Sequence, residues 1–332
     1  MTLPPDVCRE TLEPADFNEA FAPDTQQLLL LLEYDGRAFH GSQAMAKRGE
    51  RPPHAPHMTV QEAVWHAIHW LQADAWVHRC LLASRTDAGV HALSQVVQLS
   101  VSPQFFERYR DARLQLNAAF KRLGYVLMVR AMERIPTADF HIRNRTKWRW
   151  YRYQWYLAPG VSPLMPINAT PRHHGLCLQT MQAVAQLCVG THNFKAFQSV
   201  NTTPVQETVC TIASIEISQP QHALITMDVI GNRFLYRMVR NLAGAFEQVA
   251  CERNPRLHLE DVRRMLRQHD CNTARTTAPS SGLTLMSLLY PLDTSSGSDT
   301  QVLFQTDPWV QSLQTRLLHS HGVLQDNENL FR

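Results

Sequence analysis

The chain has 332 residues, of which 44% are hydrophobic and 18% charged, as in an ordinary globular protein. This length exceeds what one compact core usually holds, so two domains are expected. The longest aliphatic run, Leu28–Leu32, has the length of a strand, and no apolar run reaches the eighteen residues of a membrane-spanning helix. We therefore expect no membrane partner.

The net charge of +3 is spread unevenly along the chain. Residues 1–26 carry one arginine and six acidic residues, and residues 292–332 carry two arginines and five acidic residues. Residues 27–291 therefore have a net charge of +11, which favours a polyanionic partner. An acidic leader is unlike a signal or transit peptide, and the seven cysteines form no CxxC pair. We expect a cytoplasmic protein, with an organelle or the nucleus left open, and neither a zinc site nor a disulfide framework.

The first half is predicted to alternate strands and helices. Strands are expected over Leu28–Tyr34, Arg79–Ala83, Gln95–Val101 and Tyr125–Met132, and helices from Thr59 onward and over roughly 104–122. Thr59 and Glu62 form a T-x-x-E capping box, which marks the helix start. Residues 44–58 are rich in proline and basic residues, and a long loop is expected there.

The second half repeats this style without a detectable sequence repeat. Strands are expected over Trp148–Tyr156, 209–217, 223–230 and Leu283–Tyr290, and helices over 177–189, Phe234–Cys251 and Glu260–Arg267. This order predicts the α+β class, with two sheets that each carry helices on one face. Both tails are polar and unpatterned, so they are predicted to be poorly structured.

Residues 83–92 read ASRTDAGVHA and follow a short predicted strand. On an extended backbone, Arg85 and Asp87 point to the same side, where the arginine keeps the carboxylate ionised and oriented. An ionised, oriented carboxylate at a strand end is what covalent catalysis by aspartate requires. The residues alone leave two other interpretations open: an ordinary Arg–Asp ion pair, and an aspartate that caps the turn at Ala88-Gly89.

Two further stretches combine cations with aromatic rings. Residues 145–156 read RTKWRWYRYQWY, in which rings can stack on unpaired bases and cations bind phosphates, or the rings fill two faces of a central strand. Residues 231–244 read GNRFLYRMVRNLAG, with Arg233, Arg237 and Arg240 about one helical turn apart. This spacing gives either a solvated basic face or an Arg240 that points into a cleft. A buried arginine needs a carboxylate partner, for which Asp87 is a candidate.

Taken in this order, the motifs resemble those of the TruA family of tRNA pseudouridine synthases. The residues that carry the resemblance are Tyr34–Gly36, Phe39–Gln43, Val60–Glu62, Arg85–Ala92, Phe140–Arg143, Tyr151–Tyr153 and Gly231–Asn241. It implies the pseudouridine synthase fold, in which two ferredoxin-like or RRM-like halves with mixed antiparallel sheets meet at a central basic cleft. The expected parts are an acidic extension over 1–26, α+β domains over 27–139 and 140–291, and an acidic extension over 292–332.

The resemblance also implies a reaction, the isomerisation of uridine to pseudouridine in the anticodon stem-loop of tRNA, without cofactor or metal. Asp87 matches the nucleophile, which attacks base C6 or ribose C1′. Tyr151 matches a tyrosine placed to assist proton removal at C5, and Arg240 matches an arginine that pairs with the catalytic carboxylate. Arg85 is expected to help flip and hold the base. Further substrate contacts are expected from Thr86, His91, Arg143, Arg149, Tyr153, Arg233, Arg237 and Asn241.

The expected partners are RNA, most simply tRNA, and a second copy of the chain in a homodimer. Several positions depart from the family pattern: Ser42 replaces a common Trp, Ser84 replaces a Gly, Cys210 replaces a frequent Arg, and Arg233 replaces a small residue. The alternative function is an RNA-binding folding or ribosome-assembly factor of the same fold, with its chemistry secondary or lost. The complete set of Arg85, Asp87, Tyr151 and Arg240 favours the enzyme.

Overall fold

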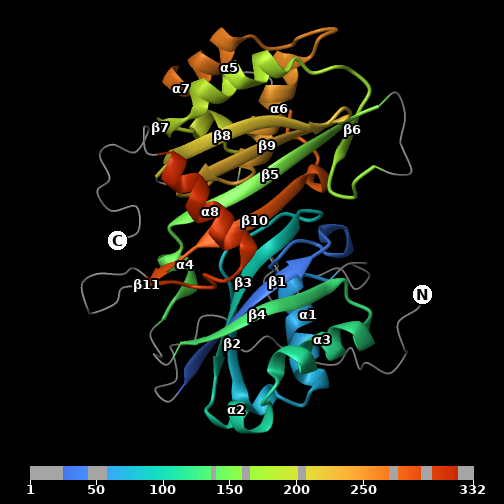
Figure 1. Cartoon of the computed structure of the whole chain (residues 1–332), viewed down its shortest axis with the longest axis vertical. Helices are drawn as coiled ribbons and strands as arrows, with labels where there is room; N and C mark the ends of the chain where they lie inside the picture. The colour runs from blue at the N-terminus through green and yellow to red at the C-terminus, as the bar shows by residue number, and fades with distance from the viewer. Residues whose placement is uncertain are drawn as a thin grey trace. The chain divides into compact units, whose positions relative to one another are not determined.

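The computed structural model describes residues 25–43, 58–135, 140–158, 165–200, 207–268, 276–292 and 301–320. The chain divides into two compact units between Thr146 and Lys147, the N-terminal and C-terminal units (Figure 1). Residues 140–146 belong to the N-terminal unit, whereas the sequence placed them in the second domain. Residues 1–24 of the acidic N-terminal extension and residues 44–57 of the expected loop lie outside the described residues.

The N-terminal unit is an antiparallel sheet with helices packed against it. Its elements are β1 (Gln26–Tyr34), α1 (Val60–Trp70), β2 (Val77–Leu82), β3 (His91–Val101), α2 (Gln104–Arg108), α3 (Ala112–Leu123), β4 (Leu127–Ile135) and α4 (Ile142–Arg145). The strand order is β4-β1-β3-β2, and helices α1 and α3 contact each other as well as the sheet (Figure 1). This β-α-β-β-α-β order is the ferredoxin-like arrangement, as predicted.

The local sequence explains where the elements of this unit begin. The capping box before α1 is present, because Thr59 accepts a hydrogen bond from the Glu62 N–H and the Glu62 carboxylate accepts one from the Thr59 N–H at 2.7 Å. The single helix expected over 104–122 is wrong, since the chain forms two helices there. Tyr109 ends α2 and donates its hydroxyl proton to the Leu71 carbonyl at 2.6 Å, and Asp111 caps α3.

The C-terminal unit repeats the same topology. Its elements are β5 (Trp148–Leu157), β6 (Thr170–Arg172), α5 (Leu178–Cys188), β7 (Gly190–Asn193), β8 (Val209–Gln221), β9 (Leu224–Gly231), α6 (Met238–Ala250), α7 (Leu259–Gln268), β10 (Leu283–Leu289), β11 (Pro291–Leu292), β12 (Gln301–Val302) and α8 (Pro308–His319). Its strands follow the order β10-β5-β9-β8-β7, with β6 parallel to β5. Without β6 and β7, the strand order is β10-β5-β9-β8, which is the ferredoxin-like arrangement again.

Helix α6 begins later than the sequence predicts. The expected helix started at Phe234, but Arg237 has the left-handed φ of +57° and the helix begins at Met238. A residue in this conformation cannot continue a right-handed helix, so the chain turns sharply before α6. The guanidinium of Arg237 lies 4.9 Å from the centroid of the Tyr236 ring. Arg240 therefore lies in the first turn of α6, whereas a helix that began at Phe234 would place it in the second turn.

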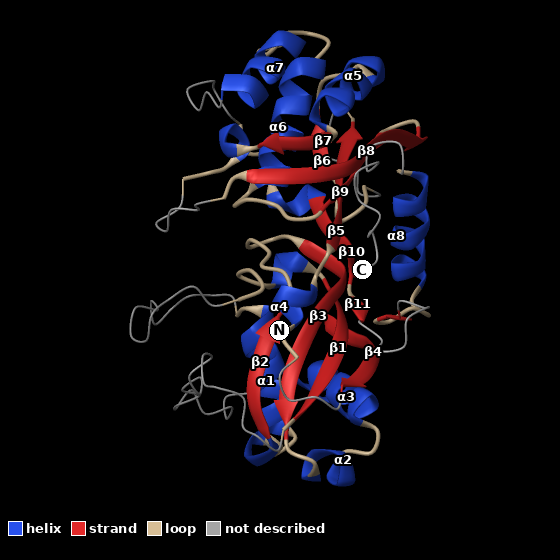
Figure 2. Cartoon of the chain, turned by 90° about the vertical axis from the view of Figure 1, so that its left-hand side faces the viewer, coloured by secondary structure: helices blue, strands red, loops and turns tan. Residues whose placement is uncertain are grey.

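The prediction that residues 292–332 are poorly structured is wrong for residues 301–320. Asp307 caps α8 by accepting hydrogen bonds from the Trp309 and Val310 N–H groups, and Pro308 occupies the first turn. Val310, Leu313 and Leu317 are buried and share one helical stripe, which gives α8 an apolar face in a polar tail. Figure 2 shows that α8 lies on the opposite side of this unit's strands from α5, α6 and α7.

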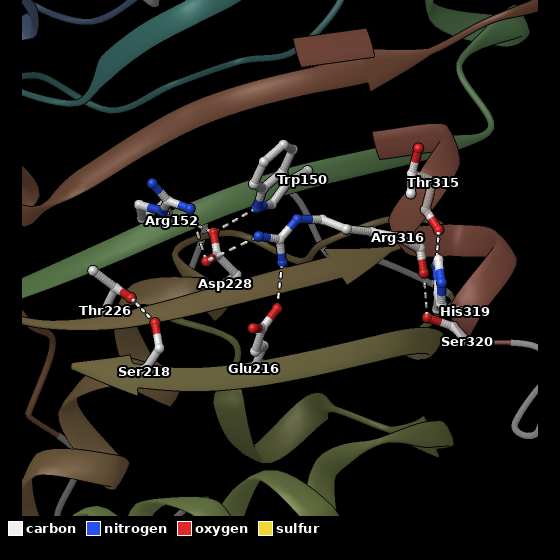
Figure 3. A network of polar contacts seen from close by, with 10 residues as sticks. All are labelled: Trp150, Arg152, Glu216, Ser218, Thr226, Asp228, Thr315, Arg316, His319 and Ser320. Carbon is white, nitrogen blue, oxygen red and sulfur yellow. Dashed lines mark hydrogen bonds and ion pairs between the residues drawn. The ribbon is translucent and has the colours of Figure 1, made fainter. Parts of the chain in front are cut away.

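A buried carboxylate joins α8 to the sheet (Figure 3). Asp228 on β9 accepts hydrogen bonds from the Trp150 indole at 2.6 Å and from the Arg152 guanidinium at 2.9 and 3.0 Å. Arg316 on α8 lies 4.0 Å from Asp228, 4.6 Å from the Trp150 ring centroid, and forms an ion pair with Glu216. Trp150 and Arg152 therefore lie on the face of β5 that α8 covers. Because side chains alternate along a strand, the odd-numbered residues of β5 point to the opposite face.

Candidate functional site

The loop between β2 and β3 presents Asp87 at the start of a tight turn. The Val90 N–H donates a hydrogen bond to the Asp87 carbonyl at 3.2 Å, which closes the turn. Gly89 occupies the third position with φ of +83°, the position at which a type II turn requires glycine. The Asp87 side chain is half-buried, so the predicted turn at Ala88-Gly89 places a carboxylate at the edge of the sheet where solvent reaches it.

Hydrogen bonds from two neighbouring segments fix this loop. The Thr86 N–H donates to Ser42 Oγ at 2.8 Å, the Ser42 N–H donates to the Thr86 carbonyl at 3.1 Å, and the Thr86 hydroxyl lies 2.9 Å from the Tyr34 hydroxyl. At the start of the loop, the Gln95 amide donates to the Ser84 carbonyl at 2.7 Å and accepts from the Ser84 N–H at 3.1 Å. The residues before Asp87 are thus held on both sides.

His91 secures the other end of the loop. Its Nδ1 accepts a hydrogen bond from the Gly36 N–H at 3.2 Å and lies 3.2 Å from the Asp35 carboxylate. Burial raises the pKa of Asp35, but the hydrogen bonds from Arg37 and its positive charge outweigh burial and lower that pKa below its ordinary value. His91 is itself buried, so these contacts give it a role in holding the loop, and its contact with RNA stays a prediction.

In the C-terminal unit, Tyr151 and Arg240 have well-defined surroundings. The Tyr151 ring on β5 packs edge-to-face on Phe234, with ring centroids 5.4 Å apart. The Arg240 Nε donates a hydrogen bond to the Ala278 carbonyl at 2.8 Å, and the Ala278 N–H donates to the Arg240 carbonyl at 3.1 Å. Asp87 and Arg240 belong to different units, and their predicted pairing stays a prediction.

Arg149 shares one face of β5 with Tyr151, and Arg233 interacts electrostatically with Arg149. Arg149 donates a hydrogen bond to the Asn232 carbonyl, and Arg233 donates to the Glu207 carbonyl at 3.0 Å. Burial lowers the pKa of Arg149 and the positive charge of Arg233 lowers it further, while the Tyr151 phenol opposes this shift. Arg149 therefore interacts electrostatically with both Tyr151 and Arg233. The expected contacts of the two arginines with RNA stay predictions.

Tyr153 and Asn241 lie in the core of the C-terminal unit. Tyr153 is fully buried, its hydroxyl lies 3.0 Å from both Thr170 Oγ1 and the Pro279 carbonyl, and burial raises its pKa to about 12. Asn241 is buried and donates to the Phe197 carbonyl at 2.7 Å. These contacts stabilise the packing of the unit, and the expected RNA contacts of both residues stay predictions.

Arg85 and Arg143, both expected to contact the substrate, lie together in the N-terminal unit. Each donates a hydrogen bond to the side-chain oxygen of Gln43. Gln43 was visible in the sequence only as part of a motif, and Arg79 and His141 were not among the predicted site residues. The charge of Arg79 acts on both Arg143 and His141. The positions of Arg79 on a predicted strand and of His141 in the FH-x-R motif were visible, but not their proximity.

Within the part of the chain that the structure describes, no cluster of three or more His, Cys, Asp or Glu side chains is suited to bind a metal ion. None of the helices described is both long and apolar enough to span a membrane.

The sequence was compared with families and proteins of known identity. The family model described as tRNA pseudouridine synthase matches residues 184–291. The tRNA pseudouridine synthase A of Legionella pneumophila (strain Lens) is 31% identical over 268 residues, which cover 80% of this chain and 93% of that protein. The enzyme of the same name from Ruminiclostridium cellulolyticum is 31% identical over 267 residues, covering 80% of this chain and 100% of that protein. That of Chlamydia muridarum is 31% identical over 271 residues, covering 80% and 93%.

Two ferredoxin-like units, an RTDAGVH turn with a half-buried aspartate, and these similarities define a pseudouridine synthase. Within that class, the chain belongs to the tRNA pseudouridine synthase A (TruA) family. The predicted family and α+β fold are confirmed.

Proposed function

We propose that this chain isomerises uridine to pseudouridine in the anticodon stem-loop of tRNA, with Asp87 as the nucleophile. The main support for this proposal is the turn that presents Asp87, on a loop that is hydrogen-bonded on both sides. The chain that carries this turn belongs to the TruA family. The basic central region, with a net charge of +11 over residues 27–291, suits a polyanionic substrate.

The reaction needs a nucleophile, a means to turn the base and a proton acceptor. The target uridine leaves its stack, and the Asp87 carboxylate forms a bond to base C6 or ribose C1′. The glycosidic bond breaks, the uracil turns, and C5 bonds to C1′ as the carboxylate is released. The proton then leaves C5 with the assistance of Tyr151 and N1 takes up a proton, so the product has the composition of the substrate. Arg85 is exposed near the turn and supports the flipped nucleotide.

Mapping of pseudouridine in cellular RNA with and without the gene tests this proposal. We expect the loss of pseudouridine from tRNA anticodon stem-loops, and its return when purified protein acts on the unmodified tRNA in vitro. A protein that binds tRNA tightly but makes no pseudouridine would instead be an RNA-folding or assembly factor.

Arg240→Ala is expected to lower kcat by about 10²–10³-fold, because the carboxylate loses the cation that orients it. The change also removes one hydrogen bond to the Ala278 carbonyl, which costs about 1 kcal/mol of unfolding free energy. Single-turnover kinetics and thermal melting separate the two effects. Arg263→Ala, on the exposed surface of α7, is the matched control and should change neither. A melting temperature that collapses while the turnover of the folded fraction persists would mark Arg240 as structural.

Gly36→Ala is expected to reduce turnover by more than tenfold, since a misplaced catalytic group loses rate steeply. A Cβ at Gly36 would lie 2.1 Å from the Val90 carbonyl oxygen, so the turn that carries Asp87 must move. Gly124→Ala is the control, because its φ of +74° costs stability while no atom lies within 4 Å of its Cβ. Equal turnover in the two folded variants would show that the turn tolerates displacement.

We also propose that the chain works as a homodimer, as its resemblance to the bacterial enzymes implies. Its cysteine usage and acidic N-terminal residues favour the cytoplasm, with an organelle or the nucleus left open. Light scattering on the purified protein tests the first point, since one chain has a mass of 38.0 kDa. A measured mass of about 38.0 kDa, that of one chain, at micromolar concentration would contradict the homodimer.

A further inference from the structure

Two arginines of the N-terminal unit share a single neutral acceptor. Gln43 Oε1 accepts a hydrogen bond from Arg85 Nε at 2.9 Å and another from Arg143 Nη2 at 2.8 Å. The Arg143 Nε also donates to the Leu82 carbonyl at 2.8 Å, which fixes this guanidinium against the end of β2. Two guanidinium groups that bond to the same oxygen must lie side by side.

The charges around this pair are positive. Burial lowers the pKa of Arg143, and the positive charges of Arg85 and Arg79 lower it further. The pKa of His141 is lowered in the same way, first by burial and then by Arg79 and Arg143. Bringing like charges together costs free energy, which an anion bound between them would offset.

The residue at position 43 explains how the pair is assembled without losing its charge. A carboxylate there would form ion pairs with both arginines and cancel one positive charge. The amide of Gln43 supplies the same acceptor oxygen but leaves both charges in place. Arg85 uses its Nε for this bond and is exposed, so its Nη groups face outward. Planar guanidinium groups arranged in this way suit the oxygens of a phosphate.

We propose that Arg85 and Arg143, aligned by Gln43, bind one phosphodiester of the RNA beside the target uridine. Gln43 is a positioning residue, and the charge of Arg79 strengthens the local positive potential. The phosphate lies next to the attacked nucleotide because Arg85 is two residues from Asp87 in the chain. That the RNA is tRNA rests on the proposed function.

The test is the affinity for unmodified tRNA as a function of salt, measured by fluorescence anisotropy between about 50 and 300 mM potassium chloride, a range that spans nearly one decade of salt concentration. We expect Gln43→Glu to weaken binding by about tenfold and to reduce the slope of log Kd against log salt by about one unit, the loss of one phosphate contact. Its melting temperature should equal or exceed that of the wild type, because the new carboxylate pairs with both arginines. A purely structural Gln43 would instead give a lower melting temperature in Gln43→Glu and leave the salt slope intact.

Gln104→Glu makes the same charge change at an exposed position of α2 in the same unit and should leave the slope unchanged. If Gln43→Glu does not fold, Arg143→Lys tests the same contact: it keeps the charge, so affinity should fall about tenfold with little change in slope. Wild-type affinity and slope in the folded Gln43→Glu protein, or wild-type affinity in Arg143→Lys, would overturn the phosphate site. Binding without pseudouridine formation in the wild type would overturn the proposed function and not this site.

Discussion

Asp87→Asn should abolish pseudouridine formation while leaving the affinity for tRNA within about tenfold of the wild type. The amide keeps the size and shape of the carboxylate but is not a nucleophile, so no bond to the uridine forms. Affinity depends mainly on phosphate contacts made by arginine and lysine, which this change does not touch. The turn should persist, because the backbone bond from Val90 to the Asp87 carbonyl remains.

Nucleoside analysis of tRNA after prolonged incubation measures the product, and anisotropy measures binding. Asp74→Asn changes an exposed aspartate of the same unit in the same way and should retain wild-type activity. Any pseudouridine formed by a pure, sequence-verified Asp87→Asn protein would remove this aspartate from the role of nucleophile.

The strands and most helices could be predicted from local patterns. The leucine run of β1, the capping box of α1 and the alternating residues of β3 each specify an element within a few neighbouring residues, and the structure contains all three. The succession of strands and helices in each half then predicts the α+β class, and the ferredoxin-like halves are what the resemblance to the TruA family implies. The aromatic run of β5 fits the expectation of a central strand, since Trp150, Tyr153 and Trp155 are fully buried.

The errors arise where contacts between distant residues override local propensity. An apolar spacing continues from Phe234 into α6, but the left-handed Arg237 interrupts it. The apolar stripe of α8 has only three buried residues in a polar tail. The partners of Arg316, which help to hold α8 on the sheet, lie on β8, β9 and β5. No local pattern reports such contacts.

The RTDAGVH motif was visible in the sequence, whereas its supporting contacts were not. RTDAGVH identifies Asp87 as a candidate nucleophile because the motif resembles that of the TruA family. The bonds from Gln43 to Arg85 and Arg143 join residues that are 42 and 100 positions apart. Only the folded N-terminal unit brings them together.

The second large effect expected concerns stability: Asp228→Ala should lower the free energy of unfolding by about 3–5 kcal/mol. Asp228 is 2% exposed and accepts hydrogen bonds from the Trp150 indole and from two nitrogens of Arg152. Its removal leaves a buried indole N–H and a partly buried guanidinium without their acceptor, which costs more than the contacts themselves contributed. Arg316 loses a carboxylate as well, so the contact between α8 and the sheet weakens.

Urea denaturation followed by tryptophan fluorescence measures this loss, since Trp150 lies in the network and Trp309 packs on it with ring centroids 6.1 Å apart. Glu216→Gln is the matched control: Glu216 also pairs with Arg316, but its side chain is 58% exposed, so at most about 1 kcal/mol should be lost. Because strand alternation places Tyr151 on the other face of β5, the folded Asp228→Ala protein should keep its catalytic rate at low temperature and lose it on mild heating. Equal losses in the two variants would mean that the buried carboxylate stabilises the sheet no more than an exposed ion pair does.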